Sequence, residues 1–234
     1  MRKAVLLLLI ALAISCNAPS QSPGAKNALL KRHTFYPAGY PQEKGRFPAI
    51  LLMPQRDNMA GKLAGQGYIV MTTYCEDRGS DGLLEDAGRL DRAKRRVRDN
   101  LELLKTQPAV DPRRIGVIGL ALSGYFATYL ASRTGETGIK AAVVYYGIFE
   151  IPEHIVNLRA PVLAFQGDAD NQDLVKQTLA MERLARDNNR SFELLTYNNA
   201  HRGFEFGVTP APADEFAVRD SWARTIAFLN KNLK

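Results

Sequence analysis

The chain has 234 residues, of which 46% are hydrophobic and 24% are charged, so it is too hydrophobic for a disordered protein and long enough for one sizeable domain. It contains only two cysteines and three histidines, which excludes a disulfide framework and leaves no Cys/His spacing typical of zinc sites. The formal net charge of +7 is compatible with an anionic partner such as a nucleic acid or a membrane surface.

The N-terminus has the pattern of an export signal. Met1-Arg2-Lys3 is basic, and residues 4–14 form an almost unbroken apolar run. This run of about 11 residues is too short to span a bilayer as a helix. We therefore expect residues 1–15 to be a signal peptide.

Cys16 directly follows this segment and is preceded by Leu12-Ala13-Ile14-Ser15. The arrangement resembles a bacterial lipoprotein processing site, with the leucine one place further from the cysteine than in the usual pattern. Residues 16–27 then form a polar tether rich in Ser, Pro and Gln. We expect an exported protein of the bacterial cell envelope, anchored in the membrane through a lipidated Cys16. The alternative is cleavage near Ser15, which would leave a soluble periplasmic or secreted protein.

The remaining residues, 28–234, alternate strand and helix patterns. Strands are expected at 33–36, 47–53, 68–74, 115–118, 139–146, 161–165 and 192–197, and helices at 58–66, 89–106, 125–130, 172–186 and 214–233. Apolar strands separated by helices are typical of an α/β domain with a mostly parallel central sheet and helices on both faces. Neither an internal repeat nor a linker divides this region, so we expect a single domain.

Much of the positive charge lies in the helix expected at 89–106. Its apolar residues Leu90, Ala93, Val97, Leu101 and Leu104 recur at helical spacing, which leaves the basic residues on the outward face. For an exported protein this pattern favours a solvated face near anionic lipid. We therefore expect no nucleic-acid partner.

The chemistry is expected around residues 114–125. The apolar run at 115–118 ends in glycine, and small residues and a helix pattern follow it. A strand, a tight turn and a helix are the geometry that lifts a nucleophile above a parallel sheet. The residue at the tip of this turn is Ala121.

Two acidic residues and a histidine follow later strands. Asp168 and Asp170 come after the strand at 161–165, and His201 comes after the last strand. Nucleophile, acid and histidine occur in this order in the α/β-hydrolase fold. We expect the other two histidines, His33 and His154, to be structural or exposed to solvent.

These motifs resemble those of the dienelactone hydrolase family of α/β hydrolases. The elbow of that family reads Gly-x-Cys or Ser-x-Gly-Gly, and here the corresponding residues are Gly119-Leu120-Ala121-Leu122-Ser123-Gly124. The Gly-x-x-Asp turn of the family falls on Asp170, and its Tyr-x-x-Ala-His turn falls on His201. The resemblance covers essentially the whole domain. It implies an α/β-hydrolase fold without a cap domain, hydrolysis of a small-molecule ester or lactone, and no metal or organic cofactor.

The resemblance also implies a role for each site residue. The family's thiol or hydroxyl attacks the carbonyl, the histidine takes its proton, and the aspartate orients the imidazole; Asp168 is the fallback acid. The backbone N–H of Leu122 is expected to be one oxyanion donor. The second would come from the loop after Met53, where Pro54 has no N–H, so Gln55 or Arg56 is expected. Dienelactone-cleaving members carry a glutamate on this loop, where this chain has Arg56.

Ala121 leaves three hypotheses open, because a methyl group cannot attack a carbonyl. The chain could be a catalytically inactive envelope lipoprotein that binds a ligand or partner on a hydrolase scaffold. Ser123, two residues further along, could act as a substitute nucleophile. Alternatively, Asp170 and His201 could activate a water molecule directly, or the alanine could be an introduced change.

Overall fold

The computed structural model describes residues 32–41, 45–75, 82–206 and 212–234. The expected signal peptide, the tether and Cys16 lie outside these residues. Within the described part of the chain, no helix is long and apolar enough to cross a membrane.

The described residues form one seven-stranded sheet with the strand order β1-β3-β2-β4-β5-β6-β7. The strands are β1 His33–Phe35, β2 Phe47–Met53, β3 Ile69–Thr72, β4 Val110–Leu120, β5 Ile139–Tyr145, β6 Val162–Gly167 and β7 Phe192–Tyr197. Only β1 pairs in an antiparallel manner, with β3, whereas the other neighbours are parallel. The expected mostly parallel α/β sheet is confirmed.

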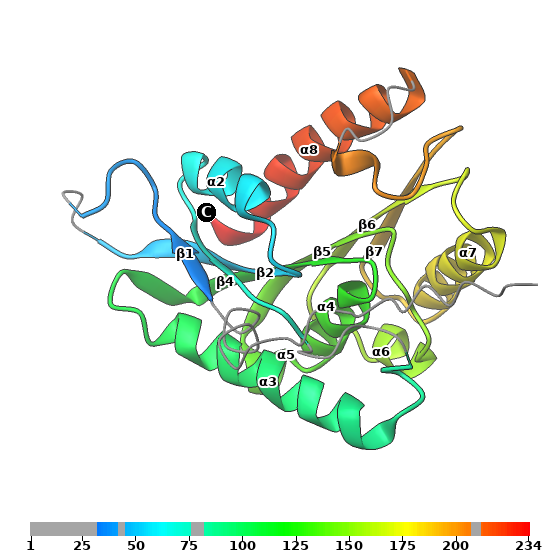
Figure 1. The fold of residues 1–234 in the computed structure, drawn as a ribbon. Helices are drawn as coiled ribbons and strands as arrows, with labels where there is room; N and C mark the ends of the chain where they lie inside the picture. Colours follow the sequence, from blue (N-terminus) through cyan, green and yellow to red (C-terminus); the bar gives the residue numbers. More distant parts are fainter. Residues whose placement is uncertain (1–31, 42–44, 76–81, 207–211) are drawn as a thin grey trace, which may run out of the picture.

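Helices cover both faces of the sheet (Figure 1). The helices are α2 Asp57–Gly65, α3 Ala87–Lys105, α4 Ser123–Ser132, α5 Thr134–Thr137, α6 Pro152–Val156, α7 Gln172–Asp187 and α8 Pro212–Leu233, with a short 3-10 turn, η1, at Phe204–Phe206. Helices α2 and α8 lie on one face, and α3, α4, α6 and α7 lie on the other (Figure 1). The described residues form no separate cap domain.

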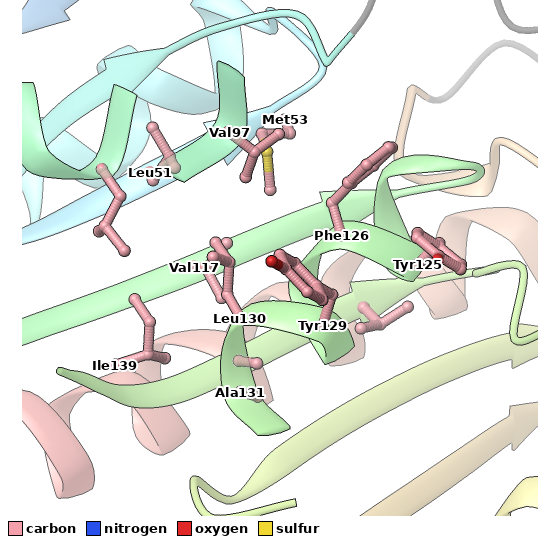
Figure 2. Packing of buried hydrophobic residues seen from close by; sticks show 14 of the residues in the cluster. Leu51, Met53, Val97, Val117, Tyr125, Phe126, Tyr129, Leu130, Ala131 and Ile139 are labelled. Carbon is pink, nitrogen blue, oxygen red and sulfur yellow. The ribbon is translucent and has the colours of Figure 1, made fainter. Parts of the chain in front are cut away.

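Each face of the sheet has its own apolar core, because side chains alternate along a strand. In β2, Leu51 and Met53 point toward α3 and α4 (Figure 2). Their neighbours Ile50 and Leu52 belong to the second cluster, under α2 and α8. The helix at 89–106 presents its apolar stripe to the first cluster, as its spacing predicts.

Strand β4 is longer than expected. The sequence pattern predicts a strand at 115–118, but β4 begins at Val110, because Val110 pairs with Phe47 of β2 before the register shifts. Proline at position 112 is accommodated in this irregular start, whereas a regular central ladder would need its missing N–H.

The parallel strands β2, β4, β5, β6 and β7 all end at the same edge of the sheet. The loops that follow β4, β6 and β7 carry Ala121, Asp170 and His201, respectively. Ligand sites in open α/β sheets form at this edge.

Candidate active site

Ala121 occupies the turn between β4 and α4 in a left-handed backbone conformation, with φ of +52°. Its N–H donates to the carbonyl of Tyr145 at 3.0 Å, and its own carbonyl accepts from Gly124 and Ile148 at 2.9 and 3.2 Å. A left-handed conformation costs an L-residue about 1–2 kcal/mol. The surrounding hydrogen bonds therefore hold a strained, sharply turned backbone at the tip of the turn between β4 and α4.

Glycines allow this turn to lie close to the sheet. A Cβ on Gly119 would collide with the backbone carbonyl of Ser123, and one on Gly124 would lie 2.7 Å from Val144 Cγ1 and 2.8 Å from Gly147 Cα. The first turn of α4 could not approach β4 and β5 so closely with side chains at these positions. The strand, turn and helix expected at 114–125 are present.

Ser123 is placed away from the cavity described below. It is only 6% exposed, and its Oγ lies 3.4 Å from Sγ of Cys75. Cys75 belongs to the apolar cluster beneath α3 and α4, on the opposite face of the sheet from α2 and α8. This placement does not favour Ser123 as a substitute nucleophile.

His201 hydrogen-bonds to an acid that the sequence reading did not consider. Its backbone N–H donates to Oδ1 of Asp214 at 2.7 Å, and its ring Nδ1 lies 3.1 Å from Oδ2 of the same carboxylate. Asp214 is fully buried at the start of α8, whereas the His201 side chain is half exposed. The expected partner was Asp170. Asp214 takes that place because it presents both oxygens to the loop after β7.

Asp170 is occupied by other partners. Its Oδ2 accepts from Gln166 Nε2 at 3.0 Å and pairs with the guanidinium of Arg202 at 3.1 Å. Its Oδ1 accepts the backbone N–H of Asn171 at 2.7 Å. These contacts satisfy the buried carboxylate without His201, so the structure does not bring the expected acid and histidine together in a hydrogen bond.

Asp168, the fallback acid, links the two loops. Its Oδ1 accepts the backbone N–H of Asn199 at 2.5 Å, and the neighbouring Ala169 N–H donates to the carbonyl of Ala200 at 3.0 Å. These bonds brace the loop after β6 against the loop that carries His201. Among the described residues, Asp168 therefore has a bracing contact and no hydrogen bond to a histidine.

A cavity of about 650 Å³ opens between α2 and α8 at the strand ends. Its wall includes Met59 and Lys62 from α2, Trp222 from α8, and Tyr145 at the end of β5. Ala121 packs against the same apolar cluster as Met59 and Trp222. Tyr145 of the cavity wall accepts the N–H of Ala121 at 3.0 Å, but neither Ala121 nor His201 is among the described residues that line the cavity.

The loop after β2 contributes Gln55 and Arg56 to the cavity wall. The side-chain amide of Gln55 lies 2.7 Å from Nδ1 of His33 and donates to Oδ1 of Asp57 at 3.2 Å. Arg56 donates from its guanidinium to the carbonyl of Gln55 at 3.1 Å. Leu122, the other expected oxyanion residue, lies directly before α4. The assignment of these backbone N–H groups as oxyanion donors stays a prediction.

The most perturbed acid of the cavity is Glu205, which the sequence reading missed. The hydroxyl of Tyr146 donates a short hydrogen bond to its Oε1. Burial raises the pKa of Glu205 from 4.5 to about 7, against the lowering effect of Tyr146, Arg56 and Arg202. Glu205 lies in the segment Phe204-Glu205-Phe206, where no motif marks it, so its burial could not be read from the sequence.

Arg202 connects the two acidic positions. It pairs with Asp170 at 3.1 Å, and its guanidinium lies over the ring of Tyr146 at 5.1 Å. Burial and the charge of Glu205 raise the pKa of Tyr146 far above its usual range. Tyr146 therefore remains a protonated donor at any physiological pH.

Among the described residues, no group of three or more His, Cys, Asp and Glu is arranged to hold a metal ion. The site consists instead of a strained turn, a histidine-carboxylate pair and a cavity with one buried carboxyl group.

The mostly parallel sheet and its two helical layers form an α/β-hydrolase fold. The model of the dienelactone hydrolase family matches residues 51–233. The chain therefore belongs to the dienelactone hydrolase family.

Individual relatives are distant. The chain is 24% identical over 220 residues to a protein of Bradyrhizobium sp. named "Probable 2-oxo-3-(5-oxofuran-2-ylidene)propanoate lactonase", with 82% of this chain and 87% of that protein covered. The fold of this chain is similar to that of a dienelactone hydrolase-like promiscuous phosphotriesterase from metagenomic libraries. The TM-score is 0.67 and the identity 18%, with 88% of this chain and 99% of that chain covered. It is also similar to the esterase Est2 of Thermogutta terrifontis, with a TM-score of 0.63, 18% identity and coverage of 85% and 90%.

Proposed function

We propose that this protein hydrolyses a carboxylic ester or lactone bond of a small molecule, with a water oxygen as the attacking atom. The observation that carries this proposal is the turn at Ala121, whose backbone keeps a φ of +52° and bonds to Tyr145, a residue in the wall of a cavity of about 650 Å³. Strain of this kind persists where the surrounding structure maintains it, typically at functional sites. The name of the Bradyrhizobium relative supports a lactone or ester as the substrate class.

Water is the proposed nucleophile because neither Ala121 nor Ser123 supplies one. The methyl group of Ala121 has no lone pair, and the hydroxyl of Ser123 faces the buried thiol of Cys75. The carbonyl oxygen would become an oxyanion near the N-terminus of α4, where the N–H of Leu122 is the proposed donor. The loop carrying Gln55 and Arg56 would supply the second donor.

A second candidate function is ligand binding without turnover. The same methyl group at the tip of the turn favours it, because the cavity is retained at a position where the attacking side chain is missing. In that case the ligand would have the size and chemistry of a small ester or lactone, and the protein would release it unchanged.

Hydrolysis of p-nitrophenyl acetate and dihydrocoumarin distinguishes the two functions. The purified wild-type protein, the Ala121→Ser variant and the His201→Ala variant are compared with buffer alone. Saturable turnover by the wild type supports the hydrolase. Activity of the Ala121→Ser variant alone supports the binding protein, and activity of neither would mean that position 121 is not the nucleophile position. The His201→Ala variant measures the contribution of the histidine to whichever activity is found.

We further propose that the protein acts at the bacterial cell envelope, held there by lipid on Cys16. The support is the sequence alone, namely the basic start, the apolar run of residues 4–14 and the polar tether that follows. Metabolic labelling with a palmitate analogue is expected to label the wild type and not a Cys16→Ser variant. An unlabelled wild type would instead support a soluble periplasmic or secreted protein.

A further inference from the structure

We propose that Glu205 is the general base of this site, whose carboxylate takes the proton of the water that attacks the substrate carbonyl. This inference rests on the proposed hydrolytic function and names the group that activates the water. It follows from the position of Glu205 in the cavity wall and from the hydrogen bonds that its two oxygens do and do not make.

Glu205 is held in a fixed position by its aromatic surroundings. It lies in the turn η1, directly after Phe204, which is fully buried. The Phe204 ring packs against the rings of Tyr197, Tyr146 and Tyr145, with centroid distances of 5.5, 6.0 and 6.1 Å. The packing of Phe204 anchors the turn that carries Glu205, and the hydrogen bond from Tyr146 holds its carboxylate, as a positioned base requires.

The two carboxylate oxygens of Glu205 have different environments. Oε1 accepts the hydroxyl of Tyr146. Oε2 is buried and has no hydrogen-bond partner among the described residues. A buried carboxylate oxygen without a donor is costly. Since Glu205 lines the cavity, a water or substrate donor within the cavity would satisfy it.

The charges around Glu205 allow it to exchange a proton near neutral pH. Arg56 from the loop before α2 and Arg202 from the loop after β7 favour the carboxylate, as does the hydrogen bond from Tyr146, while burial favours the neutral acid. Arg219 of α8 lies in the wall of the same cavity, and Asp57 and Lys62 of α2 also line it. The balance places the pKa of Glu205 at about 7, where a general base is both ionised and sufficiently basic.

Glu205 is also connected to the elbow through adjacent residues of the loop after β5. The N–H of Ala121 donates to the carbonyl of Tyr145 at 3.0 Å, and the next residue, Tyr146, bonds to Glu205. Tyr145 and Glu205 line one cavity, so a substrate bound in that cavity would lie between the residue bonded to the turn and the proposed base.

The proposed reaction has two steps. The water oxygen forms a bond to the carbonyl carbon while its O–H bond breaks and the proton passes to Glu205, which leaves a tetrahedral oxyanion. The oxyanion then collapses, the bond to the alkoxide leaving group breaks, and Glu205 returns the proton to that alkoxide. The sum is ester plus water giving acid plus alcohol, and for a lactone the two products remain one hydroxy acid.

His201 is less suited to this step in the structure. Its side chain is half exposed, and it is not among the described residues of the cavity wall. Glu205 lies in that wall, and its Oε2 has no hydrogen-bond partner among the described residues.

The test is the dependence of kcat/KM on pH, from pH 5 to 9, for the wild type and the Glu205→Gln variant. The Glu215→Gln variant, at an exposed position of α8, serves as the matched control. We expect the wild type to lose activity toward acid with a midpoint near pH 7. The Glu205→Gln variant should lose about 100-fold or more in kcat with little change in KM, and its residual rate should lack the acid limb.

A Tyr146→Phe variant provides a second readout that a purely structural glutamate would not give. Loss of the donor to Oε1 should raise the pKa of Glu205 and move the acid limb to higher pH. If kcat of the Glu205→Gln variant stays within about threefold of the wild type and its acid limb is unchanged, Glu205 is not the base. The proposed hydrolytic function would not be affected by that result. Absence of wild-type turnover on every ester and lactone would overturn both proposals.

Discussion

Asp214 binds both the backbone N–H and the ring Nδ1 of His201, at 2.7 and 3.1 Å. The histidine after the last strand is therefore oriented by a carboxylate from α8. The carboxylate from the loop after β6, Asp170, is bound to Arg202 instead. The consecutive residues His201 and Arg202 are therefore each paired with a different carboxylate, His201 with Asp214 and Arg202 with Asp170.

The His201–Asp214 pair predicts a ring tautomer. At pH 8 we expect ¹⁵N NMR to show His201 with its proton on Nδ1, because that nitrogen donates to the Asp214 carboxylate. The Asp214→Asn variant should change the ring ¹⁵N shifts and lower the free energy of unfolding by about 1–3 kcal/mol. The Asp170→Asn variant should leave those shifts unchanged, and a shift of the His201 signals in that variant would show that the pairing is misassigned.

The strain at Ala121 predicts a stabilising substitution. In the Ala121→Gly variant, relief of the left-handed conformation should stabilise the fold by about 1–2 kcal/mol, and glycine's greater freedom in the unfolded chain should cost about 1 kcal/mol. We therefore expect urea unfolding to show stability equal to or up to about 1 kcal/mol above the wild type.

The matched control is Ala227→Gly at an exposed position of α8, which should cost about 1 kcal/mol. Equal destabilisation by the two substitutions would contradict the left-handed turn at position 121.

Glu205 predicts a stability that falls as pH rises. Its folded-state pKa of about 7 exceeds the ordinary value of 4.5, so the folded protein holds the proton that the unfolded chain releases between these values. Relative to the Glu205→Gln variant, the wild type should lose about 2 kcal/mol of stability between pH 5 and pH 8. Urea unfolding of both proteins at these two pH values measures the difference, and parallel pH dependences would disprove the buried carboxyl.

Burial of His154 predicts the opposite pH dependence, a stability that falls as the pH decreases. Its ring packs against those of Tyr125 and Tyr129, at 4.9 and 5.5 Å, and burial, with Lys94 and Arg133 nearby, lowers its pKa to about 4. Below about pH 6.5 this histidine becomes protonated in the unfolded chain but stays neutral in the folded protein. The free energy of unfolding therefore falls as the pH falls toward 4.

A His154→Phe variant keeps the aromatic contacts and lacks this titration. Between pH 7 and pH 5 the wild type should lose about 1–2 kcal/mol more than the variant. An equal loss in both proteins, measured by urea unfolding, would show that His154 does not carry the effect.

The architecture and the elbow could be predicted from the sequence because both are local patterns. Apolar strands alternate with amphipathic helices, and glycines at positions 119 and 124 mark the close contacts of the turn. The actual partners of the site residues could not be predicted from the sequence. Tyr146 meets Glu205 across 59 positions and His201 meets Asp214 from a separate helix, so these contacts depend on how the loops pack. Asp170 was assigned to His201 from chain order, which does not specify which carboxylate faces the ring.

The most direct test of water as the nucleophile is the early time course of p-nitrophenyl acetate hydrolysis by stopped flow. We predict that the wild type releases p-nitrophenol linearly from the first turnover, above the rate in buffer, because no acyl-enzyme accumulates. The Ala121→Ser variant should add a burst if the turn presents its new hydroxyl to the substrate. A wild-type rate equal to that of buffer, or a wild-type burst equal in amount to the enzyme, would contradict hydrolysis by direct attack of water.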